Sequence, residues 1–269
     1  MATRTWRWRT VLFYVCHALP VVLWLVFFRL SKNVPREYRP VPAVMALPQM
    51  DEVLAGGLPH RYIGRVHYLV LDCAAAFVYT IHVLTSIVYL VWLVSKRTHQ
   101  IALGYLWAFG MMNLLSELTH FLWPTAPPWY YERYHDRIPD YTEKGDAAGL
   151  LRVDAYFGIT FYYETYRASP VVFGAFPSMH AGWPSLMAVA HTMRREAVGS
   201  KWLWLYVCYV CWAAMYLHHH YLADVLGGLV YGWCAYAFVC YMQSRDSYRQ
   251  ELSPDSTPIE TAAVVDDVV

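Results

Sequence analysis

His220 and Asp224 are the first side chains whose types and spacing suggest catalysis. They lie four residues apart at the start of an apolar run, and residues i and i+4 share one face of a helix. Asp224 would accept a hydrogen bond from one imidazole nitrogen of His220 and leave the other nitrogen free to attack. A carboxylate is costly near a membrane interior, so we favour a functional pair over an ion pair that only seats the helix.

A second group of reactive residue types lies in the segment Gly174-Ala-Phe-Pro-Ser-Met-His180. Pro177 fits the first turn of a helix, where its missing N–H is not needed. Ser178 and the free N–H groups of that turn would bind an anion, and His180 would exchange a proton with a bound phosphate ester.

The 12 histidines do not form the boxes of a di-iron hydroxylase or desaturase. Those enzymes need several H-x-x-x-H and H-x-x-H-H boxes, and the sequence contains neither. Its one cluster is His218-His219-His220. Adjacent side chains on a helix point in different directions, so this triplet is not expected to converge on one metal ion.

The composition indicates a membrane protein. Charged residues make up 15% of the chain, compared with about 25% in a soluble domain. The 12 Trp and 23 Tyr residues suit membrane–water interfaces. A net charge of +1 without a basic stripe excludes a nucleic-acid binder, and the apolar share of 58% excludes a soluble enzyme.

Six apolar runs approach the ~20 residues that cross a bilayer. They are 10–28, 68–94, 101–123, 171–193, 202–217 and 220–242. We therefore predict an all-α polytopic membrane protein with six transmembrane helices. Residues 1–242 form one membrane domain with its core at 68–242, and the polar tail 243–269 is expected to be disordered and cytoplasmic. The first run lacks a cleavage site and is predicted to be retained.

Positive charges on the short connections predict that both termini are cytoplasmic. These charges are Lys96, Arg97, Arg194, Arg195 and Lys201, together with Arg4, Arg7, Arg9, Arg245 and Arg249 near the termini. The long loops 29–67 and 124–170 then share the opposite face with the 217–220 turn. His180 and Leu217 each lie about 20–23 Å along a helix from the cytoplasmic side, so His180 and His220 reach similar depth.

These motifs resemble a known family. Pro177-Ser178-x-His180 followed by His220-x-x-x-Asp224 is similar to the second and third signature motifs of the type-2 phosphatidic acid phosphatase (PAP2) superfamily. Further strings resemble its fungal inositol phosphorylceramide synthase branch, over roughly residues 45–242. They are Met112-Asn113-Leu114, Pro127-Pro128-Trp129-Tyr130, Gly149-Leu-Leu-Arg152-Val-Asp154, Phe173-Gly-Ala-Phe-Pro-Ser-Met-His180 and Met215-Tyr-Leu-His-His-His-Tyr221.

The resemblance implies a PAP2-like helical bundle in which His220 is the nucleophile, Asp224 orients it and His180 is the general acid. It also implies a phosphate-binding role for Arg152 with Ser178 and His219 nearby and Lys144 in support, and no metal or cofactor. Trp129 and Tyr130 are either a lid or a stiff interfacial turn. Asn113, Glu117 and His120 share a helical face and either line the cavity or bond to neighbouring helices. Asp72 and His82 receive no role, and the loop acids Glu143, Asp146, Asp154 and Glu164 are expected to be solvated.

The sequence departs from the phosphatase pattern where that pattern carries positive charge. Lys144 is eight residues from Arg152, Val153 follows Arg152 in place of Pro, Ala213-Ala214 stands where Ser-Arg is usual, and Met179 replaces Gly. A phosphomonoester dianion needs more positive charge than a phosphodiester monoanion. The departures therefore favour a phosphodiester donor.

The resemblance thus predicts a Golgi phosphotransferase with a lumenal site. It would move phosphoinositol from phosphatidylinositol to the primary hydroxyl of ceramide and release diacylglycerol. Its partners would be these membrane lipids and a small membrane accessory subunit, with no nucleic acid. Two alternatives stay open: a lipid phosphate phosphatase that uses water, and a non-catalytic lipid-binding or scaffold protein.

Orientation gives the first test. A cysteine placed in the 135–145 loop should react with an impermeant thiol reagent added from the lumenal side, and Ser200→Cys should react from the cytosolic side. The unsubstituted chain is the control for its six native cysteines. The reverse labelling pattern would contradict the predicted orientation.

Overall fold

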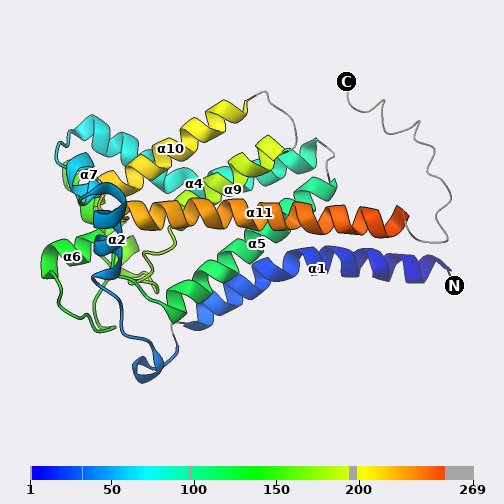
Figure 1. Cartoon of the computed structure of the whole chain (residues 1–269), viewed down its shortest axis with the longest axis horizontal. Helices are drawn as coiled ribbons and strands as arrows, with labels where there is room; N and C mark the ends of the chain where they lie inside the picture. The colour runs from blue at the N-terminus through cyan, green and yellow to red at the C-terminus, as the bar shows by residue number, and fades with distance from the viewer. Residues whose placement is uncertain (1, 32, 97–98, 194–198, 252–269) are drawn as a thin grey trace.

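A computed structural model describes residues 2–31, 33–96, 99–193 and 199–251 of the protein. Six long helices run side by side: α1 (Ala2–Ser31), α4 (Leu69–Ser95), α5 (His99–Leu122), α9 (Met179–Met193), α10 (Ser200–Tyr216) and α11 (Leu222–Glu251) (Figure 1). Within the described residues the strand-like pairs are isolated bridges, from Thr125 to Ala43 and to Gly174. The prediction of an all-α fold is confirmed.

The long loops 29–67 and 124–170, which were predicted to share one face, contain short helices. They are η1 (Arg36–Tyr38), α2 (Ala46–Ala55), α3 (Pro59–Ile63), α6 (Pro128–Tyr134), η2 (Ala148–Leu150), α7 (Leu151–Phe157) and α8 (Phe161–Arg167). Helices α2, α6 and α7 lie at one end of the bundle, and the start of α1 and the end of α11 lie at the other (Figure 1). We call the end with the short helices the loop end.

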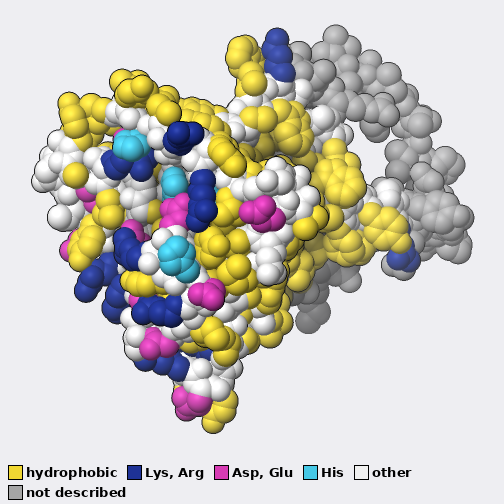
Figure 2. Space-filling view, turned by 60° about the vertical axis from the view of Figure 1, so that its left-hand side comes forward, with side chains coloured by type: hydrophobic (Ala, Val, Ile, Leu, Met, Phe, Trp, Pro, Cys, Tyr) yellow, Lys and Arg dark blue, Asp and Glu magenta, His cyan; other side chains and the backbone are white. Residues whose placement is uncertain are grey.

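Three helices are long and apolar enough to cross a membrane: Leu69–Ser95, Gln100–Leu122 and Leu222–Arg245. They indicate an integral membrane protein. Helices α9 and α10 are shorter, with 15 and 17 residues, so the expected count of six spans goes beyond what these lengths support. Charged and histidine side chains gather at the loop end, whereas hydrophobic side chains cover the surface of the long helices behind it (Figure 2).

The boundaries of two predicted spans need correction. The fourth span was expected at 171–193, but α9 begins at Met179 and Pro177 precedes it. Residues before Pro177 are not helical because they pair with another loop: Thr125 donates its N–H to Phe173 O and accepts at its own carbonyl from Ala175 N, at 2.8 and 3.3 Å. Helix α11 begins at Leu222 instead of 220 and continues to Glu251, past the expected boundary at 242.

Parts of the predicted cytoplasmic face lie outside the described residues. This applies to Arg97, Arg194 and Arg195 and to 252–269 of the predicted tail. The structure therefore does not test the charges expected there.

Glycines let α9 and α11 pack backbone to backbone. A Cβ on Gly228 of α11 would lie 2.0 Å from the carbonyl oxygen of Ser178, and a Cβ on Gly232 would lie 2.8 Å from that of Gly182. Gly228 and Gly232 are four residues apart and so share one helix face. This face brings the first residues of α9 against the first turns of α11, and His180 and Asp224 lie there.

The close contact predicts a large effect for a small substitution. Gly228→Ala should lower the free energy of unfolding by ~1–3 kcal/mol or more, because the added methyl group meets backbone atoms that cannot move away cheaply. Val230→Ala, on the exposed face of the same helix, is the control and should change it little. The two midpoints of thermal unfolding in detergent check this, and equal midpoints would contradict the contact.

Candidate active site

A chain of hydrogen bonds links the three residues expected to be catalytic. Nδ1 of His220 lies 3.1 Å from Oδ2 of Asp224, and Nε2 of His220 lies 3.0 Å from Nδ1 of His180. With the Asp224 carboxylate as acceptor, Nδ1 of His220 donates and its Nε2 carries the lone pair. That lone pair accepts the proton on Nδ1 of His180. We call these three side chains the histidine relay.

In this structure the hydrogen bond between His220 and His180 blocks the nitrogen that would attack phosphorus. The attacking nitrogen of His220 is already bonded to His180, so a phosphorus atom can reach Nε2 only after the His180 ring moves aside. A general acid must lie within hydrogen-bond reach of the atom it protonates, so the displaced His180 ring would have to reach the oxygen that leaves from phosphorus.

His220 is held by a turn, not by the first turn of a helix as the sequence predicted. It lies two residues before α11, and the N–H groups of His219 and His220 both donate to Ala214 O, at 3.1 and 3.2 Å. The backbone curls back over the end of α10, and this gives the imidazole the same access to Asp224 that i and i+4 spacing would give.

Asp51, which the sequence analysis did not single out, fixes the start of α11. Its two carboxylate oxygens accept the N–H groups of Leu222 and Ala223, at 3.1 and 2.8 Å. These N–H groups have no partner within a helix, and a carboxylate at a helix N-terminus stabilises it. Asp51 lies 171 residues away in sequence from Leu222, so no local spacing could have identified it.

The turn is also supported from the loop end. The carbonyl of His218 accepts a hydrogen bond from the N–H of Trp129 at 3.2 Å. The Nδ1 atom of the His218 ring lies 2.8 Å from Oε2 of Glu132. Burial raises the pKa of the Glu132 carboxyl, but the neighbouring His218 and His60 outweigh burial and lower that pKa to about 2. Glu132 is therefore charged at neutral pH.

His180 and His220 open into a cavity of about 380 Å³, which we call the histidine cavity. Tyr79 stacks on the His180 ring at 3.8 Å between centroids, and the His82 ring lies 4.4 Å from it. His82, to which the sequence assigned no role, therefore belongs to the site. The feature of the sequence that could have identified His82 is its position three residues after Tyr79 on an apolar helix.

Several predicted substrate-binding residues line this cavity. Asn113, Glu117, His120, Trp129 and His219 are among its walls. Asn113 accepts a hydrogen bond from Nε1 of Trp183 at 2.8 Å, and Nε2 of His219 donates to Ala147 O at 3.1 Å. Trp129 also lines a second hollow of about 460 Å³ at the loop end, as does Asp146, so both residues border the two spaces.

Two predicted residues are buried in the packing instead. Tyr130 is fully buried, and its hydroxyl donates to Arg137 O at 3.2 Å. Ser178 is also fully buried; its N–H donates to Asp224 O at 2.9 Å, and its Oγ has no hydrogen-bond partner within the described chain. The expected anion site at Ser178 is therefore not open to the cavity, because α11 covers the start of α9.

Arg152 is not brought to the histidine cavity. Its Nε and Nη2 lie 2.8 and 2.6 Å from Oδ1 of Asp72, and the hydroxyl of Tyr216 donates to the same oxygen at 2.8 Å. Asp72 is buried at the start of α4, and a buried carboxylate needs such a partner. Arg152 lines the hollow beyond Trp129 instead.

The cations near the site come from other positions. Lys144 lines a cavity of about 260 Å³ together with Arg39 and Arg167, and this cavity shares Glu117 and His120 with the histidine cavity. Only Lys144 of these three was predicted. The expectation that the loop acids are solvated is wrong for Asp154, which is buried and accepts the N–H groups of Tyr162 and Tyr163.

Comparisons with known proteins agree with the resemblance seen in the motifs. The family model of the PAP2 superfamily matches residues 51–238. The inositol phosphorylceramide synthase catalytic subunit aur1 of Schizosaccharomyces pombe is 32% identical over 231 residues, 84% of this chain and 52% of that protein. The inositol phosphorylceramide synthase of Candida albicans is 32% identical over 233 residues, 83% of this chain and 48% of that protein.

A bacterial protein is similar as well. The phosphoinositol dihydroceramide synthase of Bacteroides thetaiotaomicron is 30% identical over 190 residues, 67% of this chain and 60% of that protein. The chain spans about half the length of the two fungal relatives. No solved structure matches it.

The relay predicts that His220 cannot be replaced. We expect His220→Ala to reduce phosphoryl transfer at least about a hundredfold, because covalent and acid–base roles are worth ~10²–10⁴-fold. His67→Ala, at an exposed loop position, is the control. Transfer of a labelled head group measures the rate, and thermal unfolding checks that both variants fold. A rate above about one-hundredth of wild type in His220→Ala would reject His220 as the nucleophile.

Proposed function

Because the chain belongs to the PAP2 superfamily, we propose that it is a membrane phosphotransferase that moves phosphoinositol from phosphatidylinositol to the primary hydroxyl of ceramide. The observation that carries this proposal is the histidine relay, with His220 bonded to both Asp224 and His180 inside the histidine cavity. The names of the fungal and bacterial relatives support the choice of donor and acceptor.

The first half-reaction forms a phosphohistidine. Nε2 of His220 attacks the phosphorus of phosphatidylinositol, and the bond from phosphorus to the diacylglycerol oxygen breaks. His180, as the imidazolium, gives one proton to that oxygen and becomes neutral, so neutral diacylglycerol leaves. Asp224 stabilises the positive charge that develops on the His220 ring, as a buried carboxylate does for a histidine in other acid–base sites.

The second half-reaction returns the enzyme to its starting state. The primary hydroxyl of ceramide loses its proton to His180 and attacks the phosphorus, and the phosphorus–nitrogen bond to His220 breaks. The product is inositol phosphorylceramide. Splitting one difficult displacement into two easier ones is the general advantage of a covalent intermediate.

The cations of the adjoining cavity are proposed to bind the phosphate. Arg152 is neutralised by Asp72, so we assign phosphate binding to the wall of that cavity that Lys144 and Arg167 line. The choice of phosphatidylinositol over phosphatidate as the donor rests on the names of the fungal and bacterial relatives.

The proposal includes a setting and a partner. We place the enzyme in the Golgi membrane with its termini in the cytoplasm and the histidine cavity facing the lumen. The location of the start of α1 and the end of α11 away from the loop end supports this orientation (Figure 1). The name of the S. pombe relative, a catalytic subunit, supports a small membrane accessory subunit as partner.

Trp129 is proposed to limit access of water to the phosphohistidine. Trp129 borders both the histidine cavity and the hollow at the loop end, and water must be excluded if a lipid hydroxyl is to be the acceptor. The lid role that the sequence suggested therefore falls on Trp129, while Tyr130 supports it from within the packing.

The fate of the phosphoinositol group tests the proposal. With labelled phosphatidylinositol and ceramide, lipid product should exceed free inositol phosphate, as measured by mass spectrometry. Trp129→Ala should shift the ratio toward free inositol phosphate, because water enters through the opened wall. Trp202→Ala, an exposed tryptophan of α10, is the matched control and should leave the ratio unchanged. If the wild-type protein releases mainly inositol phosphate or free phosphate despite abundant ceramide, a phosphatase function takes the place of the transferase.

A further inference from the structure

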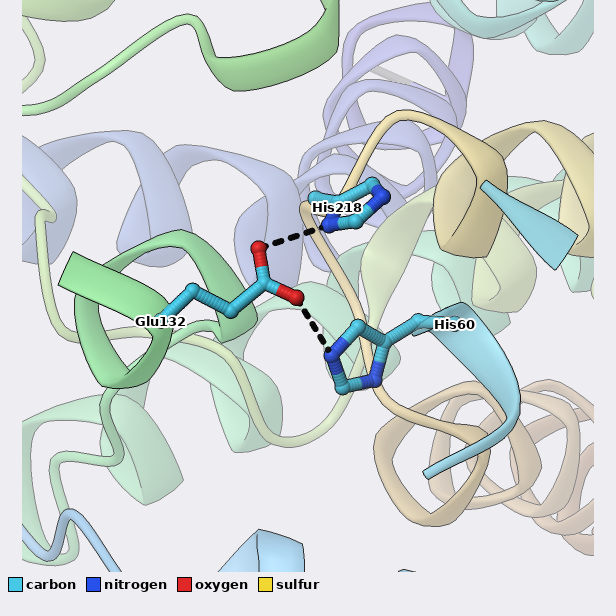
Figure 3. Close-up of side chains that lie close together, drawn as sticks. All are labelled: His60, Glu132 and His218. Atoms are coloured by element: carbon cyan, nitrogen blue, oxygen red, sulfur yellow. Dashed lines mark hydrogen bonds and ion pairs between the residues drawn. The ribbon is translucent and has the colours of Figure 1, made fainter. Parts of the chain in front are cut away.

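Three side chains from separate segments meet at the loop end, outside the histidine cavity. His60 comes from α3, Glu132 from α6 and His218 from the turn before α11. Oε1 of Glu132 lies 3.2 Å from Nε2 of His60, and Oε2 lies 2.8 Å from Nδ1 of His218. The carboxylate is directed between the two rings, with one oxygen toward each (Figure 3).

From this geometry we propose that His60, Glu132 and His218 bind a zinc ion that holds the catalytic turn in place. Two histidines and one glutamate are a common ligand set of zinc, usually with water as the fourth ligand. Bonds of about 2.0–2.2 Å place tetrahedral ligands about 3.3–3.6 Å apart. The three ligand atoms all lie within 4.8 Å of one another, so small side-chain movements bring them to these separations.

His60 provides an independent indication of a missing ligand. Its side chain is fully buried, yet neither of its ring nitrogens makes a hydrogen bond within the described residues. The 3.2 Å approach of Nε2 to Glu132 does not have hydrogen-bond geometry. A buried polar atom without a hydrogen bond is costly, and a metal ion bonded to Nε2 would remove that cost for Nε2. Without a metal ion, the ion pair with Glu132 is the contact that the structure gives to this nitrogen.

The site can be reached by an ion and has room for a water ligand. The side chains of Glu132 and His218 are 29% and 20% exposed, and both line the hollow of about 460 Å³ at the loop end. Arg61 lies 3.7 Å from Oε1 of Glu132 and over the Tyr131 ring, and its side chain is 48% exposed. A bound cation requires this guanidinium to turn toward solvent.

A metal ion here would act on the site through the backbone. His218 has a left-handed conformation, with φ of 60°, and its carbonyl holds the N–H of Trp129. It is two residues before His220. The ring of His218 also packs against Gly64, where a Cβ would lie 2.1 Å from Nε2. Zinc would thus hold α3, α6 and the 218–220 turn together. That turn carries His220 and the carbonyl that binds the N–H of Trp129.

The test measures metal content directly. The detergent-solubilised full chain, purified without a histidine tag, is treated with a chelator, incubated with zinc and separated from free metal by gel filtration. We expect one zinc per chain in the wild type and in the control His67→Ala, and at least about tenfold less in Glu132→Gln, which keeps the size of the side chain but removes the charged ligand. Zinc should also raise the midpoint of thermal unfolding of the wild type and of His67→Ala, but not of Glu132→Gln.

A second measurement needs no variant and so does not depend on whether one folds. Cobalt added to the chelator-treated wild type should give the visible absorption of a four-coordinate cobalt ion and should be displaced by zinc. Absence of this absorption overturns the proposal. Failure of the wild type to retain zinc also overturns it, as does equal retention by Glu132→Gln and His67→Ala.

Discussion

The backbone contact between the start of α9 and the first turns of α11 is the constraint on which the histidine relay depends. Gly228 allows the carbonyl of Ser178 to lie where a side chain would otherwise be, and the N–H of Ser178 donates to Asp224 O at 2.9 Å. The hydrogen bonds between His220 and His180 and between His220 and Asp224, at 3.0 and 3.1 Å, tolerate little change in this spacing. The helix contact thus sets the geometry of the chemistry.

The charges of the site are arranged around this contact in two groups. Arg152 is bound to Asp72 and lies beyond Trp129, whereas Arg39, Lys144 and Arg167 line the cavity that adjoins the histidines. Arg152 therefore stabilises the fold, and the proposed binding of phosphate rests on the second group.

The sequence was sufficient for the parts of the site that depend on short spacing. The all-α fold followed from apolar run length, and Asp224 contacts His220 as the four-residue spacing suggested, although a turn and not a helix provides the contact. Glu117 and His120 line the cavity as their shared helix face indicated. These inferences need only the periodicity of a helix.

Contacts between distant segments could not be read in the same way. The pairing of Arg152 with Asp72, the cap that Asp51 forms on α11 and the approach of His60 to Glu132 each join residues from different loops and helices. The late start of the fourth span has the same origin, because Thr125 holds Phe173 and Ala175 in backbone hydrogen bonds that no local preference encodes. These contacts and the boundary of the fourth span depend on how the loops pack, which helix periodicity does not determine.

The most direct test of the account is to trap the covalent intermediate. The protein is incubated with phosphatidylinositol in the absence of ceramide, denatured rapidly, digested and analysed by mass spectrometry under conditions that preserve phosphorus–nitrogen bonds. A phosphoinositol group should be found on His220 and should disappear when ceramide is added before denaturation. A group on His180 instead, or product formation with no modified histidine at any time, would contradict the role assigned to the histidine relay.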